Sequence, residues 1–379
     1  MATKRILVGE GSAEPTVGFD FARQMFSPDS VEFFFGVRRS SEGLNQLNTP
    51  GVSVVANFPG RGMKGLTTPP QNCNLSAFRI SRVLDSGRLQ ADALLVVATP
   101  PNAKGERSLG TANGPLQSAI DNAPLIIVEE WEELPSLPGA ATIPADKPLK
   151  VIQHKPATFA PLSRPPTELD YACAEHIATL IDDNTPIQIG VGGIIEALSD
   201  QLKTRRNLRI ISGAVGETIR KLHNFGCLSP SENILGTALV GDADIIEWAK
   251  TTANLRLMSS REIHNPKWLA KIANFHSLNI ALSVDLEGNV NAESIGERQI
   301  SGKGGSPNFA QGAALSPGGH AIVALRGDRE NSLVDKIDRP TIPGSHISYI
   351  VCENGIADLR NKSLEEKAVA LKKLFKQSP

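Results

Sequence analysis

The sequence is poor in cysteine, and the way its cysteines and histidines are scattered excludes several kinds of site. Its 379 residues include only four cysteines, Cys73, Cys173, Cys227 and Cys352. No two of them form a C-x-x-C pair, so the spacing favours reduced thiols over a redox or zinc motif. The seven histidines contain no H-x-x-x-H pair. We therefore expect no metal site.

Long apolar runs and an excess of one charge are also missing. The first apolar run, residues 6–8, is too short for the core of a secretory signal, and no window approaches ~18 consecutive apolar residues. A cytoplasmic protein without a membrane partner is expected. The chain has 39 basic and 40 acidic side chains, which leaves a net charge of −1. Nucleic-acid binding usually needs a clustered basic face, so no nucleic-acid partner is expected either.

The sequence does contain a repeated alternation of short apolar runs and helical patterns. This alternation predicts an α/β fold with mostly parallel sheets. In the first half, the runs predict strands at 4–9, 31–37, 51–58, 93–101 and 124–130, and helices at 16–26 and 115–123. In the second half, strands are predicted at 187–193 and 208–215, helices at 169–181, 194–202, 217–226 and 363–376, and further apolar runs lie at 278–286, 320–327 and 347–355.

A proline-rich segment separates the two halves. Residues 132–168 hold eight prolines and no convincing helix, and such segments mark domain boundaries. A chain of this length is long enough for two domains. We predict one α/β domain over residues 1–160 and a second over residues 161–379.

Three motifs carry candidate chemistry. Gly190-Val191-Gly192-Gly193 follows a predicted strand and opens a helix, where free N–H groups could receive an oxyanion or phosphate, although a plain glycine turn fits equally well. Gly302, Gly304 and Gly305 cluster in a second loop that either lets a ligand approach the backbone or is a flexible surface loop. In the third motif, 351–360, Glu353 is either catalytic or structural.

The order and spacing of these motifs resemble the acetyl-CoA hydrolase/CoA-transferase family, which contains the acetate, succinate, butyrate and 4-hydroxybutyrate CoA-transferases. The segments that carry the resemblance most specifically are SGKGG at 301–305 and VNAESIG at 290–296, and it extends over nearly the whole chain. The resemblance implies two α/β domains with the active site between them. It also implies coenzyme A or an acyl-CoA as substrate, no metal, and a homo-oligomer, commonly a dimer.

In the family a glutamate attacks the acyl-CoA and then carries CoA as a thioester. Its motif reads roughly N-S-A-(hydrophobic)-E-V-D-L, and here Asn279 and residues 284–286 fix the register, so that Ser283 occupies the glutamate position. Serine can form an ester with the acyl group but cannot accept CoA as a thioester. Ordinary CoA exchange is therefore doubtful.

Three interpretations are open for Ser283. Ser283 could be a nucleophile for hydrolysis or acyl transfer, for which it needs a nearby base, and the sequence cannot place His264 or His276 beside it. The scaffold could instead act non-covalently through its glycine loops, or be an inactive CoA-ester-binding or partner subunit. Glu293 and Glu353 are further candidate catalytic carboxylates.

A second departure follows the glycines, where the family commonly reads Gly-Gly-Gln-x-Asp-Phe-x-Arg-Gly. In this chain Asn308 and Gln311 replace the acid and the arginine, and Pro307 stiffens the turn. This predicts an altered acyl pocket. The glycines that resemble the CoA and oxyanion loops remain, namely Gly190, Gly192, Gly193, Gly302, Gly304 and Gly305.

Overall fold

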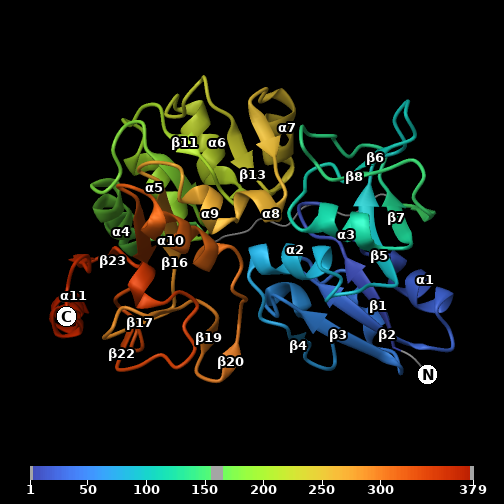
Figure 1. The fold of residues 1–379 in the computed structure, drawn as a ribbon, viewed down its shortest axis with the longest axis horizontal. Helices are drawn as coiled ribbons and strands as arrows, with labels where there is room; N and C mark the ends of the chain where they lie inside the picture. Colours follow the sequence, from blue (N-terminus) through green and yellow to red (C-terminus); the bar gives the residue numbers. More distant parts are fainter. Residues whose placement is uncertain (1–2, 155–164, 376–379) are drawn as a thin grey trace. The chain divides into compact units, whose positions relative to one another are not determined.

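The computed structural model describes residues 3–154 and 165–375 (Figure 1). The chain divides into two compact units. The first consists of Met1–Pro161, Thr237–Arg261 and Gln299–Gly304, and the second of Leu162–Gly236, Glu262–Arg298 and Gly305–Pro379. The predicted boundary between residues 160 and 161 lies outside the described residues and stays a prediction.

A seven-stranded sheet with strand order β4-β3-β2-β1-β5-β7-β9 forms the first unit (Figure 1). All of its described pairings are parallel, as expected for strands that alternate with helices. Its strands are β1 (Thr3–Val8), β2 (Ser30–Phe35), β3 (Val52–Ala56), β4 (Gln71–Asn72), β5 (Ala93–Ala98), β7 (Ile126–Glu130) and β9 (Leu149–Gln153). The short strands β6 (Arg107–Ser108) and β8 (Thr142–Ile143) pair antiparallel beside it.

The two faces of this sheet bury alternate residues of the same strands. In β1, Leu7 faces one apolar cluster, while Ile6 and Val8 face the other. The first cluster contains apolar residues of α2 (Ala77–Asp85) and α3 (Leu116–Asn122), and the second those of α1 (Gly18–Met25) and η1 (Leu44–Leu47). Because successive side chains of a strand point to opposite faces, helices on both sides require continuous apolar strands. The remaining elements of this unit are η2 (Arg61–Met63), β14 (Ala238–Leu239), α7 (Ala243–Thr251) and β15 (Leu255–Leu257).

The second unit is built on a six-stranded sheet with order β11-β10-β16-β21-β23-β24 (Figure 1). Its pairings are parallel except for β23 with β24, which run antiparallel. The strands are β10 (Pro186–Ile189), β11 (Arg209–Ile210), β16 (His276–Ile280), β21 (His320–Ala324), β23 (Tyr349–Cys352) and β24 (Gly355–Asp358). A smaller sheet, β18-β17-β22, joins β17 (Ser283–Asp285), β18 (Val290–Asn291) and β22 (Leu333–Val334).

Helices pack on this second sheet and on one another. Helix α4 (Glu168–Ala178) contacts α5 (Gly193–Gln201) and β23, while α10 (Ser306–Leu315) contacts β16 and β21. A capping box between Thr167 and Asp170 begins α4. The other elements are β12 (Ala214–Val215), α6 (Glu217–Asn224), β13 (Ile234–Gly236), α8 (Ser260–Ile263), α9 (Pro266–Leu269), β19 (Ser294–Ile295), β20 (Arg298–Gln299), η3 (Gly344–His346) and α11 (Leu364–Phe375).

The predicted fold class, α/β with mostly parallel sheets, is confirmed. The predicted strand at 278–286 is divided in the structure into β16 and β17. The division arises because Ala281 N–H still donates to Ala324 O of β21, whereas Leu282 N–H donates to Asn291 O of the smaller sheet. The sequence interpretation missed β9, which lies within the proline-rich segment, and helix α2.

Candidate active site

Ser283 is the first residue of β17, three residues beyond the carboxyl end of β16. It pairs with Asn291 of β18 and is buried. Its Oγ accepts a hydrogen bond of 3.3 Å from Asn291 Nδ2. The carboxyl ends of parallel strands are where open α/β sheets carry their ligands, so Ser283 lies in a suitable position for chemistry.

Within residues 3–154 and 165–375, no histidine or carboxylate side chain is hydrogen-bonded to the Ser283 hydroxyl. His276 begins β16 and therefore lies at the opposite end of that strand. Burial lowers the pKa of His264 to about 3, so this imidazole is too weak a base to take a proton at neutral pH. The structure thus supplies Ser283 with a hydrogen-bond donor but not with the base that a serine nucleophile requires.

Asn291 is the partner of Ser283 that sequence reasoning missed. Its Oδ1 accepts from the backbone N–H groups of Glu293 (3.0 Å) and Ser294 (3.1 Å). Its Nδ2 donates to Ser294 O at 2.8 Å. These contacts fix the amide, so the N–H bond toward Ser283 has a fixed direction. The only sequence signal for it was its place in the VNAESIG segment.

The two candidate carboxylates, Glu293 and Glu353, make contacts that hold loops together. Glu293 is buried, and its Oε1 accepts a 2.9 Å hydrogen bond from Thr341 Oγ1. Glu353 Oε2 accepts a 2.9 Å hydrogen bond from the backbone N–H of Gly327, which joins the turns that follow β21 and β23. Both carboxylates thus make contacts that stabilise loops. A catalytic role for Glu293 or Glu353 stays a prediction.

The Gly190–Gly193 turn connects β10 to helix α5, as predicted. Gly192 has φ +134°, which favours glycine, and a Cβ on Gly190 would lie 3.2 Å from Leu278 O. Gly192 is the N-cap of α5, and no side chain caps the helix. The backbone N–H groups at the start of α5 can therefore receive a negatively charged oxygen.

A pair of buried amides lies just before this turn. Asn279 Nδ2 donates to Gln188 Oε1 at 3.0 Å, and Gln188 Nε2 is 3.3 Å from Asn279 Oδ1. The two residues belong to the neighbouring strands β16 and β10. Their reciprocal bonds satisfy both side chains and fix the ends of the strands that lead to Ser283 and to the glycine turn.

The second glycine cluster contains a point where the chain leaves the first unit and enters the second, between Gly304 and Gly305. A Cβ on Gly302 would lie 1.9 Å from Asn57 O, and Gly304, with φ +55°, accepts a 2.8 Å hydrogen bond from Ala77 N–H through its carbonyl. Both belong to the first unit. Gly305 belongs to the second unit and is the N-cap of α10, with Pro307 in the first turn of that helix. Close backbone approach thus accounts for Gly302, and a ligand role for the loop stays a prediction.

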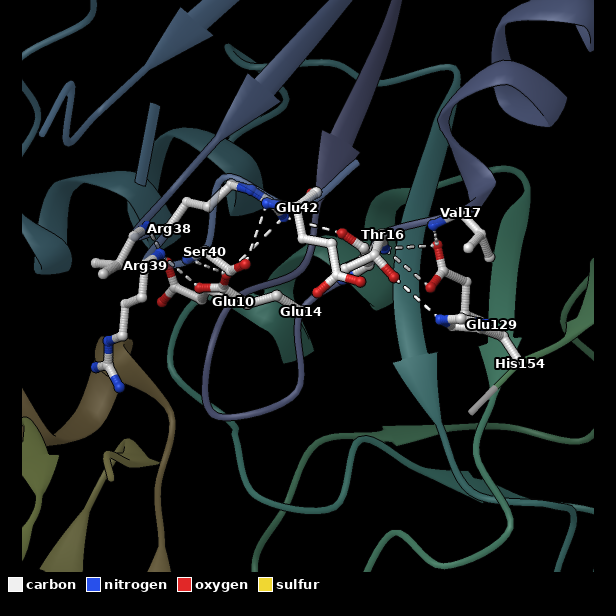
Figure 2. A network of polar contacts seen from close by, with 12 residues as sticks. Glu10, Glu14, Thr16, Val17, Arg38, Arg39, Ser40, Glu42, Glu129 and His154 are labelled. Atoms are coloured by element: carbon white, nitrogen blue, oxygen red, sulfur yellow. Dashed lines mark hydrogen bonds and ion pairs between the residues drawn. The ribbon is translucent and has the colours of Figure 1, made fainter. Parts of the chain in front are cut away.

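Sequence reasoning also missed a network of glutamates in the first unit (Figure 2). Glu14 accepts hydrogen bonds from the backbone N–H groups of Arg39 (2.8 Å) and Ser40 (3.0 Å). Glu129 accepts from three backbone N–H groups at 2.7–3.0 Å, those of Thr16, Val17 and Gly18. Burial raises the pKa of both carboxyl groups.

Glu10 belongs to the same network, just beyond the carboxyl end of β1 (Figure 2). Its Oε2 accepts a 2.7 Å hydrogen bond from Val37 N–H, and burial raises its pKa. Arg39 carries a pKa lowered by burial to about 10, and Figure 2 shows its guanidinium directed away from the glutamates. The signal available in the sequence was the GEGSAEP segment after β1, where two acids follow a buried strand.

Two further negative findings concern only the parts of the chain that the structure describes. No group of three or more histidine, cysteine, aspartate or glutamate side chains is placed to hold a metal ion there. Among the helices of residues 3–154 and 165–375, none combines the length and the apolar character needed to cross a membrane.

Comparison with known proteins gives the chain its relatives. Residues 241–374 match the family model of the acetyl-CoA hydrolase/transferase C-terminal domain. The chain is 29% identical over 310 residues to the 4-hydroxybutyrate coenzyme A transferase of Clostridium kluyveri, which covers 78% of this chain and 72% of that protein. It is 26% identical over 299 residues to the succinyl-CoA:acetate/propanoyl-CoA:succinate CoA transferase of Fasciola hepatica, over 75% of this chain and 62% of that protein.

The fold also has solved counterparts. The crystal structure of RipA from Yersinia pestis superposes with a TM-score of 0.87 at 22% identity, covering 99% of this chain and 91% of the other. This similarity concerns the fold alone. The sequence comparisons show that residues 241–374 are similar to the acetyl-CoA hydrolase/transferase C-terminal domain, and that the chain is similar to proteins named as CoA transferases.

Proposed function

We propose that the protein acts on acyl-CoA thioesters, by acyl transfer or by hydrolysis. Similarity to the matched relatives supports this substrate class, since they are named as CoA transferases. The observation that carries the proposal is that two candidate site features lie at the same carboxyl edge of the six-stranded sheet in the second unit. There Ser283 follows β16 and the uncapped glycine turn follows the adjacent strand β10.

The residue at position 283 limits which reaction the proposal includes. A glutamate can form a mixed anhydride with the acyl group and then a thioester with CoA, whereas a serine can form only an ester. Exchange of CoA between two acids through the enzyme side chain is therefore left out. The proposed reaction moves the acyl group to water or to another acceptor and releases the CoA thiol.

A second candidate function is favoured by one observation. Ser283 has a hydrogen-bond donor, Asn291, but no base among the described residues. A protein that binds CoA esters without cleaving them, as an inactive partner subunit, would need no such base. The roles of Ser283, Glu293, Glu353 and the two glycine turns are all part of the proposal, as are a cytoplasmic location and a homo-oligomeric state, commonly a dimer.

The test is turnover of a panel of acyl-CoA thioesters with water and several acceptor acids. Release of free thiol with an acyl adduct on the intact protein supports a covalent route, and release without an adduct supports direct attack by the acceptor. If Ser283 is the nucleophile, Ser283→Ala should lower the rate by orders of magnitude. Unchanged turnover in that variant would rule out the covalent serine route, and no thiol release from any thioester would favour the binding function.

One substitution tests whether the rest of the site is intact. Ser283→Glu restores the side chain that the family uses, on a strand end whose register is fixed by the Gln188–Asn279 amide pair. We expect this variant to gain CoA exchange between an acyl-CoA and a carboxylic acid. Size-exclusion chromatography with light scattering tests the proposed homo-oligomer independently of activity.

A further inference from the structure

A polar cavity of about 550 Å³ lies within the second unit, at the end of the six-stranded sheet opposite Ser283. Its wall includes His276, His320 and Tyr349, the first residues of β16, β21 and β23. These strands are parallel neighbours, so their first residues meet at the amino edge of the sheet. Small-molecule sites typically have volumes of roughly 300–1,000 Å³, a range that includes this cavity.

Hydrogen bonds hold the loops around this cavity in place. In the loop before β10, Thr185 Oγ1 donates to Asp182 O at 2.7 Å. In the loop before β16, Asn274 has φ +57°, a conformation that asparagine adopts more readily than most residues. Its backbone N–H donates to Pro317 O at 2.8 Å, which joins this loop to the one before β21. The cavity is therefore preformed, as small-molecule sites usually are.

His276 is 7% exposed and presents an unpaired ring nitrogen to this cavity. Its Nδ1 lies 2.8 Å from Asn274 O. A carbonyl oxygen can only accept, so Nδ1 carries the proton, and burial lowers the pKa of the ring to about 4, which keeps it neutral at pH 7. Nε2 is then a lone-pair acceptor. It has no hydrogen-bond partner among the described residues and is not one of their enclosed unpaired atoms, so it is open to the cavity.

Two carboxylates, those of Asp182 and Asp183, add negative charge to the same cavity. Asp183 Oδ1 accepts a 2.8 Å hydrogen bond from the backbone N–H of Arg206, whereas the Asp182 carboxylate has no hydrogen bond among the described residues. Burial is the main cause of the lowered pKa of His276, and the nearby charge of Asp182 opposes it, so this carboxylate acts on the ring. Of the described residues that line the cavity, none is a lysine or an arginine.

The basic side chains near the cavity are engaged in other contacts. Arg205 donates to two backbone carbonyl groups at and just after the end of α4, at 3.0 and 2.6 Å. Arg360 donates to both carboxylate oxygens of Asp358, at 3.0 and 2.8 Å, and its guanidinium carbon lies 4.6 Å from the centre of the Tyr349 ring. The cavity thus presents hydrogen-bond acceptors and negative charge, which together suit a ligand that is a donor and a cation.

We propose that this cavity binds a small organic cation through an ammonium group. An ammonium has three donors and no acceptor, so it can donate to His276 Nε2 and to the Asp182 carboxylate, which also offsets its charge. The rings of His276, His320 and Tyr349 form an edge-to-face row, with centroid distances of 4.8 and 5.2 Å, against which the aliphatic part of the ligand packs. This site is separate from the proposed acyl-CoA site and does not depend on it.

Titration calorimetry with putrescine tests the proposal, with butanediol as a probe of the same length that carries no charge. We expect saturable binding of putrescine and none of butanediol. Asp182→Asn should raise the Kd for putrescine by about tenfold or more, because a charge-assisted hydrogen bond is lost. Glu175→Gln, an exposed acid of α4 outside the cavity, is the matched control and should leave the Kd unchanged. Equal losses in the two variants, or equal binding of the two probes, would overturn the proposal.

An NMR measurement places the bound cation without using any variant. In protein with ¹⁵N-labelled histidine, the free state should show His276 as the Nδ1–H tautomer. We expect putrescine to shift the Nε2 signal of His276 and to leave the signals of His264, which does not line the cavity, unchanged. Butanediol should shift neither. An Nε2–H tautomer of His276 in the free state, or no shift of its signal at saturating putrescine, contradicts the inference whether or not the protein turns over acyl-CoA.

Discussion

The carboxyl edges of the two parallel sheets differ in how their polar groups are satisfied. In the first unit, each carboxylate oxygen of Glu14 accepts a hydrogen bond from a backbone N–H group. Oε1 of Glu129 accepts hydrogen bonds from several backbone N–H groups. In the second unit, Ser283 has one hydrogen bond of 3.3 Å, and the buried Nδ1 atom of His264 has none among the described residues. A saturated group stabilises the fold and has little left for a ligand. The comparison therefore points to the second sheet as the place of chemistry, and four predictions test it.

Removing a saturated acid in the first unit should have the largest effect on stability. Glu129 is 1% exposed and satisfies the N–H groups of Thr16, Val17 and Gly18 at the start of α1. Glu129→Ala leaves these donors buried and unpaired, so we expect a loss of about 3–5 kcal/mol in the free energy of unfolding. Urea denaturation measures this. The exposed Glu132→Ala should stay within about 0.5 kcal/mol, and equal stability of the two variants would contradict the prediction.

Acid should destabilise the protein through the second unit. Burial lowers the pKa of His264 to about 3 and that of His276 to about 4, against 6.5 for the unfolded chain. The unfolded state takes up protons below pH 6.5 while the folded state does not, so this stability is full above pH 6.5 and is lost as the pH falls toward 4 and 3. Each histidine should remove about 1.4 kcal/mol per pH unit, or about 2 kcal/mol at pH 5. Urea midpoints between pH 7 and 5 measure the slope, which His264→Gln should reduce.

Raising the pH should lower the stability that Glu10 contributes in the first unit. Burial raises the pKa of Glu10 above its usual 4.5, so the folded state holds a proton that the unfolded state has released. The resulting stability is full below pH 4.5 and is lost as the pH rises through the folded pKa. Glu10→Gln keeps an acceptor for Val37 N–H and removes the titration. We expect the variant to become more stable than the wild type above that pH, and parallel pH profiles of the two proteins would exclude the assignment.

Replacing Ser283 should have the smallest effect on stability. Ser283→Ala loses only the 3.3 Å hydrogen bond from Asn291 Nδ2, and the Asn291 amide keeps its bond to Ser294 O. We expect the free energy of unfolding to change by less than about 1 kcal/mol. Thermal melting of the variant beside the wild type measures this. A large loss would mean that Ser283 is a structural residue, which would remove it from the candidate site.

The sequence predicted the fold where burial on both faces leaves an unambiguous pattern. β5 is buried at all six positions, and an apolar run of this kind can be read directly as a strand. β9 was missed because it is an edge strand in which every residue is partly or fully exposed, set among prolines. The division of β16 from β17 was also missed, since it depends on which distant backbone groups accept the N–H bonds of Ala281 and Leu282.

The candidate site was predictable only in part. The register of Asn279 and residues 284–286 needs only local order along the chain, and it placed Ser283 within one apolar run at 278–286. The structure instead places Ser283 at the first position of β17, and its catalytic role stays a prediction. The His264 ring lies close to Gly305, where a Cβ would be 2.3 Å from His264 Nε2. These residues are 41 positions apart, counted from their numbers, and no local pattern reveals their contact. Whether a glutamate such as Glu10 is buried or solvated likewise depends on tertiary packing.

The reciprocal amide bonds between Gln188 and Asn279 have a consequence for how this scaffold can change. These bonds align two strand ends without involving the side chain at position 283. That side chain can therefore be replaced while the backbone of the strand ends stays in place. The side chain at position 283 and the bonds that align its strand are thus separate in this fold. A designer can therefore vary the residue at this position without altering the amide pair.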